Sequence, residues 1–225
     1  MSPSWTSLML LADGRFPSGS YAHSGGLEAA VRDGLTLGDV PGFMAARLAT
    51  VGRCEAAIAV AARRAAGRDE VDTLLCLDDE AQARCSSPPL REAASRLGSQ
   101  LLRTAVTVWS RSTILPRYRS ASESSPRPVC FGVVACAAGL PDEPAAAALL
   151  YDDAAAVTSA AVKLFPVDPA LAARWLREAG ATIDTLAREV SSREPAPWAL
   201  PSAFAPLLEA RSTAHAARER RLFAS

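Results

Sequence analysis

The chain has 225 residues, of which 49% are hydrophobic, and its 24 Lys and Arg residues balance its 24 Asp and Glu residues. That hydrophobic share is enough for a well-buried core, so the composition excludes a disordered chain. A formal charge of zero gives no general attraction to nucleic acid or to an anionic membrane. No apolar run approaches the ~20 residues that cross a bilayer, and the amino-terminal residues lack a secretory pattern. We therefore expect a cytoplasmic protein that binds neither nucleic acid nor a membrane.

Apolar residues recur at helical spacing through the first half of the chain, and glycine or proline ends each run. The predicted helices are a short one over 5–12, a second over 27–31 closed by Gly34, a long core helix from Asp39 to Gly67, one that Asp69 caps and residues 86–89 end, and one over 90–108. Gly98 lies inside the last of these, where glycine costs about 1 kcal/mol relative to alanine. We therefore expect another backbone to cross closely at Gly98.

The second half of the chain begins with a segment rich in Ser, Arg and Pro, near 116–128, for which the sequence predicts an exposed loop. A buried helix over 129–139, an alanine-rich helix over 142–164 and a helix over 168–190 are expected to follow. No segment alternates with period two between turns, so strands are not predicted. The expected fold is a single all-α domain over residues 1–225, a helical bundle of roughly seven to ten helices.

Cysteines and acidic clusters give little sign of a site. The five cysteines are an odd number with no C-x-x-C pair, which indicates reduced, buried thiols. The acidic clusters at 78–80 and 152–153 lie on predicted helices, and we interpret both as solvated faces or helix-end charges.

Residues 13–28 form the most informative segment, because glycine, serine, proline and one of the two histidines gather there between two predicted helices. The segment has neither the Gly-Lys-Ser/Thr of a phosphate-binding loop nor a correctly flanked Gly-x-Ser-x-Gly. The two histidines are too far apart in sequence to form a spaced ligand set, so no resident metal site is predicted. One alternative is a small helical hydrolase using Ser20 or Ser24 with His23. Another is a nucleic-acid-binding regulator using Arg63, Arg64 and Arg68.

The carboxyl-terminal tail, near 207–225, ends on two large apolar side chains, Leu222 and Phe223. Chain ends are usually polar and frayed, so this tail has a specific contact to make. It either docks back on its own core or anchors in a partner's pocket, with Arg220 or Arg221 pairing with a carboxylate.

Asp13 and residues 16–28 resemble the amino-terminal signature of the UreF family of urease accessory proteins. Segments 95–98, 128–132 and 215–225 follow in the same order as in that family, so the resemblance covers nearly the whole chain. Two positions depart from the family's pattern: Arg127 stands where a histidine is expected, and Ala216 replaces the acidic residue after the tail histidine.

The resemblance implies an all-α, non-enzymatic assembly factor that forms a homodimer. Its implied partners are a UreD/UreH-like accessory protein, the nickel-carrying GTPase UreG, which it would also regulate, and apo-urease. Nickel would be handled transiently within the complex, with no cofactor bound stably. We expect the alanine-rich helices over 144–190 to form the dimer face, since small side chains permit close helix approach. The residues expected to contact partners are Phe16, Pro17, Ser20, Tyr21, His23, Ser24, Gly25, Gly26, Leu27, Glu28, Arg96, Gly98, His215, Arg221, Leu222 and Phe223.

Overall fold

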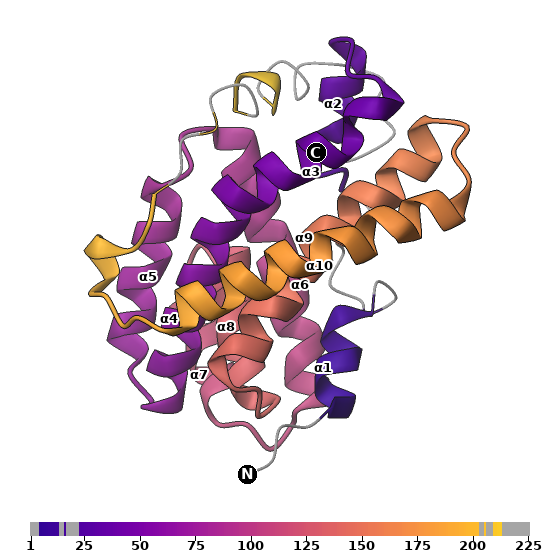
Figure 1. The fold of residues 1–225 in the computed structure, drawn as a ribbon. Helices are drawn as coiled ribbons and strands as arrows, with labels where there is room; N and C mark the ends of the chain where they lie inside the picture. Colours follow the sequence, from indigo (N-terminus) through magenta and orange to yellow (C-terminus); the bar gives the residue numbers. More distant parts are fainter. Residues whose placement is uncertain (1–4, 14–15, 17–22, 203–204, 206–208, 213–225) are drawn as a thin grey trace.

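A computed structural model describes residues 5–13, 16, 23–202, 205 and 209–212, and it folds them into a bundle of helices without strands (Figure 1). The α-helices in this part of the chain are α1 (Trp5–Ala12), α2 (Leu27–Arg32), α3 (Val40–Arg47), α4 (Arg53–Gly67), α5 (Val71–Ala83), α6 (Pro88–Val108), α7 (Ile114–Ala121), α8 (Arg127–Ala137), α9 (Asp142–Leu164) and α10 (Pro169–Ser191). Short 3₁₀ helices cover Leu37–Asp39 (η2) and Pro197–Ala199 (η4). The predicted all-α bundle of seven to ten helices is confirmed.

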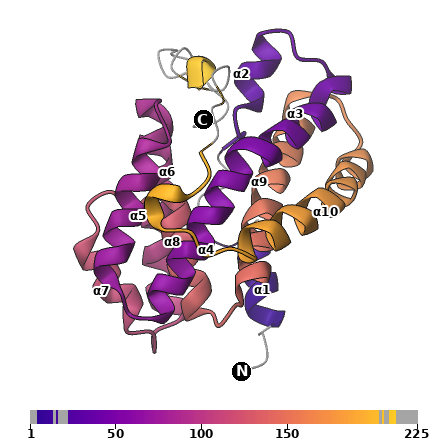
Figure 2. The same cartoon turned by 60° about the vertical axis from the view of Figure 1, so that its left-hand side comes forward.

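The core lies where α4 packs against α8 on one side and α9 on the other (Figure 2). Gly132 of α8 permits the closest of these approaches, because a Cβ atom there would lie 2.2 Å from the Ala59 carbonyl oxygen of α4. Small residues on both helices explain why the two backbones come so close. The helix predicted over 129–139 is therefore present and is one of the most buried elements of the fold.

The long helix predicted from Asp39 to Gly67 is nearly continuous but has a π-helical turn over Leu48–Gly52 (η3) between α3 and α4. Asp39 stands at the N-cap of α3 as expected, but its side chain accepts no hydrogen bond from that helix. Instead, its carboxylate accepts hydrogen bonds from the backbone N–H (2.9 Å) and hydroxyl (2.5 Å) of Thr36, which caps η2. A π turn widens a helix locally and often marks a functional position.

The exposed loop predicted near 116–128 is wrong, because helix α7 occupies 114–121 and only a short connection leads to α8. Ile114, Leu115 and Tyr118 are buried on one face of α7. The Tyr118 hydroxyl donates to Asp78 of α5 at 2.6 Å. The outer face of this helix carries serine and arginine, and its apolar stripe is narrow. A prediction based on composition therefore did not detect the helix.

Helices α9 and α10 pack against each other along their length, as Figure 1 shows. The predicted start of α10 is confirmed in detail, since the Asp168 side chain accepts a hydrogen bond from the Ala170 N–H at 2.8 Å. Within the described residues, α9 alone is long and apolar enough to meet a membrane-span test, but 61% of that stretch is buried inside the protein. It is a core helix of the bundle.

The cysteines only partly match the prediction of buried thiols. Cys54 and Cys130 are buried, Cys85 and Cys136 are half-buried, and Cys76 is exposed. All five are free thiols, so the predicted reduced state agrees with the structure.

Candidate functional site

The last residues of the amino-terminal signature segment, which the structure describes, form a tight turn that leads into α2. Gly25 and Gly26 have φ values of +61° and +88°, in the left-handed region that residues with a side chain rarely adopt. Ser24 closes the turn by accepting hydrogen bonds from the Leu27 N–H on its carbonyl (3.1 Å) and from the Glu28 N–H on its hydroxyl (3.4 Å). The Gly-Gly pair is therefore required by the backbone of this turn.

Arg47 holds this turn against the bundle. Its guanidinium donates to both carboxylate oxygens of Asp153, from Nη2 at 2.6 Å and from Nε at 2.9 Å, and Nη1 donates to the Gly25 carbonyl at 3.1 Å. The side chains of Arg47 and Asp153 are 12% and 6% exposed. Burial alone would lower the pKa of Arg47, but Asp153 outweighs that effect and the pKa is raised. One ion pair thus joins the signature segment, α3 and α9.

A second buried arginine lies beside the first. Arg127, at the start of α8, donates to Glu55 of α4 at 2.8 Å and to Asp152 of α9 at 2.7 Å. Burial opposes the charge on Arg127, yet the surrounding carboxylates raise its pKa above the ordinary value. For Glu55, burial is the largest effect and raises the pKa. The interpretation of Asp152 and Asp153 as solvated charges is therefore wrong.

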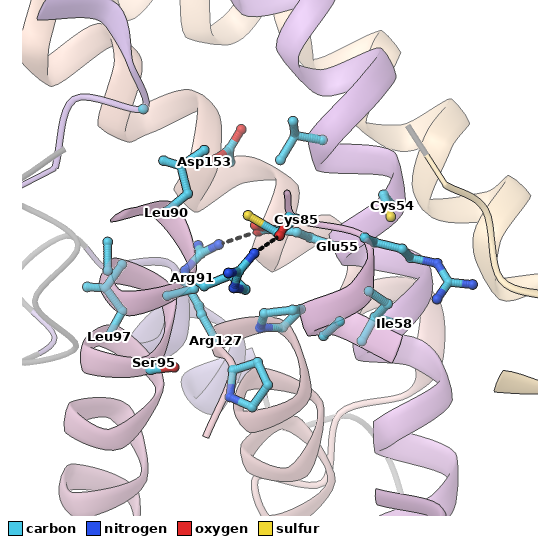
Figure 3. Close-up of a pocket in the computed structure, with 18 of the residues that line it drawn as sticks. Cys54, Glu55, Ile58, Cys85, Leu90, Arg91, Ser95, Leu97, Arg127 and Asp153 are labelled. Atoms are coloured by element: carbon cyan, nitrogen blue, oxygen red, sulfur yellow. Dashed lines mark hydrogen bonds and ion pairs between the residues drawn. The ribbon is translucent and has the colours of Figure 1, made fainter. Parts of the chain in front are cut away.

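A cavity of about 170 Å³ opens above these ion pairs, between α4, α6, α8 and α9. Glu55, Arg91 and Arg127 converge in it from three helices, and Leu90 and Leu97 give it an apolar wall (Figure 3). His23 also lines the cavity and is partly buried. Its pKa is lowered to about 4, mainly by burial and further by the positive charges of Arg127 and Arg96. At neutral pH, His23 is an uncharged imidazole at the rim of a charged cavity.

The remaining described residues of the predicted partner surface divide by burial. Ser24, Leu27, Glu28 and Gly98 are buried, so their contacts are internal and a direct partner contact by these four is not supported. Phe16 is also buried, and its ring lies 6.0 Å from that of Trp109. The surface-accessible members are His23, Gly25, Gly26 and Arg96. Pro17, Ser20, Tyr21, His215, Arg221, Leu222 and Phe223 lie outside the described residues.

Gly98 has the close crossing that the sequence predicts. A Cβ atom at this position would lie 1.9 Å from the Ser125 carbonyl oxygen and 2.8 Å from Cys130 Sγ. The partner segment is the connection between α7 and α8. It is fixed by the Ser122 hydroxyl, which accepts from the Ser125 N–H at 2.9 Å and donates to Asp78 at 2.5 Å. Gly98 is thus explained by helix packing.

Two alternative functions lose support within the residues that the structure describes. Ser24 is fully buried and its hydroxyl accepts the Glu28 N–H, so it cannot serve as a nucleophile for an external substrate, and Ser20 lies outside the described residues. Arg63 and Arg64 both bond to Asp142, and Arg68 bonds to Glu70 and Glu194, so these arginines do not form an uncompensated basic patch. In the described part of the chain, no group of three or more His, Cys, Asp or Glu side chains is arranged to hold a metal ion.

Sequence reasoning missed the charged residues that build the site, although a signal was present. Asp153 lies one helical turn from Leu149 and from Val157, both fully buried, so its position faces the core. Asp78 lies one turn after the buried Leu74 in the same way. A carboxylate on the apolar face of a helix indicates a buried partner of opposite charge or a hydrogen-bond donor.

Comparison with known proteins gives a consistent result. Residues 36–180 match the UreF family model. The chain is 32% identical over 222 residues, 98% of both chains, to the urease accessory protein UreF of Mycobacterium sp. (strain JLS). It is 33% identical over 223 residues, 97% of both chains, to the UreF of Mycobacterium bovis (strain BCG / Pasteur 1173P2). The chain therefore belongs to the UreF family of urease accessory proteins and is a non-catalytic factor in urease maturation.

Proposed function

We propose that this protein is an adaptor that joins a UreD/UreH-like accessory protein and a nickel-carrying UreG-like GTPase to apo-urease in the cytoplasm. The observation that carries the proposal is the turn at Gly25 and Gly26, which the Arg47–Asp153 pair fixes on the bundle while leaving it accessible. A surface fixed before binding loses little conformational entropy when a partner docks. Such a surface suits recognition of a protein partner.

The second contact in this proposal is the carboxyl-terminal tail, with Arg221, Leu222 and Phe223 as its anchors. Its last described turn, residues 209–212, is attached to the bundle at two points. Ser212 shares a hydrogen bond with Ser87 at 2.6 Å, and Arg211 donates to Asp33 at 2.8 Å. These attachments support a tail that begins at a defined place on the bundle.

Co-purification tests the adaptor function. The chain and its His23→Ala, Tyr21→Ala and Arg221→Ala variants are co-expressed with a tagged UreD-like protein, the UreG-like GTPase and apo-urease. Each variant is expected to weaken recovery of the complex and urease activation while keeping the helical circular dichroism spectrum. Arg117→Ala, on the exposed face of α7, is the control and leaves recovery unchanged. Full activation by all three variants would contradict the proposal.

The proposal includes two properties of the assembled complex. Nickel is handled transiently, carried by the GTPase, and this chain retains none stably. The chain also regulates the GTPase, so the rate of GTP hydrolysis by the UreG-like protein changes when the adaptor complex is added. Unchanged hydrolysis in the presence of a verified complex would remove regulation from the proposal.

Homodimerisation through residues 144–190 is part of the same proposal. Most of α9 is inside the bundle, whereas α10 keeps an exposed face that includes Ala181, Thr182 and Thr185. Small side chains on that face are compatible with close packing of a second copy. Light scattering at micromolar concentration is expected to give the mass of two chains, and a monomer would remove this element.

A further inference from the structure

The chain leaves α10 through a proline-rich strap, residues 195–201, that crosses α5. One arginine at the end of α5 binds most of it. Arg84 donates from Nε to the carbonyl of Pro201 at 3.1 Å and from Nη2 to the carbonyls of Leu200 (3.1 Å), Trp198 (3.3 Å) and Pro197 (3.4 Å). Its remaining nitrogen, Nη1, bonds to the carbonyl and the carboxylate of Glu80. The Arg84 side chain is 10% exposed.

This arrangement follows from the composition of the strap. Prolines have no N–H group, so the strap cannot form a regular ladder that would satisfy its carbonyls. A guanidinium carries five N–H donors in one plane and can serve several carbonyls together. Cys54 adds one more donor, since its thiol lies 3.0 Å from the Pro201 carbonyl. Within the strap, the Leu200 side chain is buried, whereas Trp198 is 76% exposed.

The strap and the last described turn attach to the same end of α5. Ser87, which bonds to Ser212, lies only three residues after Arg84. The path from α10 to the tail is therefore fixed at Arg84 first and at Ser87 next. The figures agree on this course, because the yellow strap passes beside α5 in both Figure 1 and Figure 2 before it reaches the last turn.

We propose that Arg84 is a positioning residue for partner binding, which fixes the strap at residues 197–201 and so sets the point from which the carboxyl-terminal tail meets its protein partner. This inference rests on the proposed function, in which the tail beyond Ser212 binds the UreD-like protein. Without the Arg84 contacts, residues 197, 198, 200 and 201 lose the hydrogen bonds to their carbonyls that Arg84 makes, and the strap samples more positions. Binding then requires the chain to lose that additional freedom.

Two substitutions separate hydrogen bonding from packing at this position. Arg84→Met keeps the aliphatic bulk and removes every donor, whereas Arg84→Lys keeps a charged donor without the planar fork. Arg117→Met is the matched control, because Arg117 also pairs with a carboxylate, that of Asp69, but both side chains are exposed and neither belongs to a proposed partner surface. Two quantities are measured on each full-length variant: hydrogen exchange at the Ala199 and Leu200 amides, and affinity for the purified UreD-like protein.

Arg84→Met is expected to accelerate exchange at both amides and to weaken binding about tenfold, as expected for lost preorganisation. Arg84→Lys is expected to fall between Arg84→Met and the wild type, and Arg117→Met to match the wild type. A role in packing alone predicts equal behaviour of the Met and Lys variants. Equal affinities for the two variants, or faster exchange with wild-type affinity, would overturn the inference.

The proposed function is tested separately by Arg221→Ala in the same assay. If Arg221→Ala weakens binding while Arg84→Met does not, the inference about Arg84 is wrong and the tail contact remains. If neither weakens binding, the tail contact itself is wrong.

Should Arg84→Met fail to fold, Glu80→Gln decides the question, since it removes the carboxylate that orients the guanidinium and keeps Arg84. A folded Glu80→Gln variant with wild-type affinity would overturn the inference, and weaker binding with faster exchange at the strap would support it.

Discussion

The guanidinium of Arg47 lies against both carboxylate oxygens of Asp153, and its third nitrogen reaches the carbonyl of Gly25. The pair joins two segments that are 106 residues apart in sequence. A buried ion pair is weak evidence for stability by itself, because desolvation offsets much of the attraction. The Arg47–Asp153 pair instead favours one arrangement of these segments. The Nη1 atom that Asp153 leaves free binds the Gly25 carbonyl, so the turn docks at that position.

Removing one member of this pair should be costly. Arg47→Met leaves Asp153 buried without its counter-ion, so we expect the free energy of unfolding to fall by about 3–5 kcal/mol. Urea denaturation followed by circular dichroism measures the change. The variant should also release the Gly25 turn, which hydrogen exchange in α2 would detect.

The double variant Arg47→Met/Asp153→Asn distinguishes an uncompensated charge from lost packing. It should be more stable than Arg47→Met alone, because no unpaired buried charge remains. Arg117→Met removes an exposed pair with Asp69 and should change stability by no more than about 0.5 kcal/mol. Additive losses in the double variant would show that the pair is not coupled.

Gly98 and Gly180 make a matched pair of helical glycines. Gly98→Ala places a Cβ atom 1.9 Å from the Ser125 carbonyl, so α6 must move away from the α7–α8 connection, at a cost of about 3 kcal/mol. Gly180→Ala meets no atom within 4 Å and should stabilise the protein by about 0.5–1 kcal/mol through helix propensity. Chemical denaturation of both variants checks the opposite signs. A neutral Gly98→Ala would mean that the crossing relaxes easily.

Local sequence signals predicted the helices well where apolar periodicity and end signals agree. Asp168 followed by proline marks the start of α10 because the carboxylate accepts the Ala170 N–H, a contact between near neighbours in sequence. Helix α7 escaped prediction because it is short and polar on its outer face. Its stability depends on Tyr118 reaching Asp78, 40 residues away, and no local pattern contains that contact.

The sequence predicted where the candidate site lies, but not which ion pairs build it. The Gly-Gly turn and His23 were found because unusual residues gather in one segment. The ion pairs beneath them join residues 25 to 106 positions apart, from Arg127 with Asp152 to Arg47 with Asp153. One sequence gives no direct information on such pairings, and only the placement of an acid on an apolar helix face hints at them.

The buried Asp78 carboxyl should make stability depend on pH. Burial is the largest influence and raises its pKa to about 6, while hydrogen bonds from Ser122 and Tyr118 act in the opposite direction and the charge of Asp79 adds to the increase. The folded-state pKa exceeds the unfolded value of about 3.9. The neutral acid therefore stabilises the fold, and this contribution is fully present below a pH of about 3.9. The contribution is lost as pH rises through 6, and it amounts to about 2–3 kcal/mol at most.

Asp78→Asn isolates this effect, because the amide keeps an acceptor for Tyr118 and does not titrate in this range. Urea denaturation is measured for the wild type and the variant at pH 7, 6, 5 and 4. The stability of the wild type relative to the variant should increase as pH falls from 7 to 4, even though other carboxylates destabilise both proteins in acid. A difference that stays constant with pH would contradict the raised pKa.

His23 should remain uncharged well below neutral pH, because burial and the nearby charges of Arg127 and Arg96 lower its pKa to about 4. The pKa is depressed, so the stability that the neutral ring contributes is present above the unfolded value of about 6.5 and is lost as pH falls through 4.

NMR titration of the imidazole C–H signals measures the pKa directly. The chain has two histidines, so a His215→Gln variant assigns the remaining signal to His23. Arg127→Met should shift that titration upward by removing one positive charge, whereas Arg174→Met should leave it in place. A His23 signal that titrates near 6.5 in the wild type would contradict this prediction. The ring would then be solvated, and the turn at Gly25 would lie further from the ion pairs than it does in the structure.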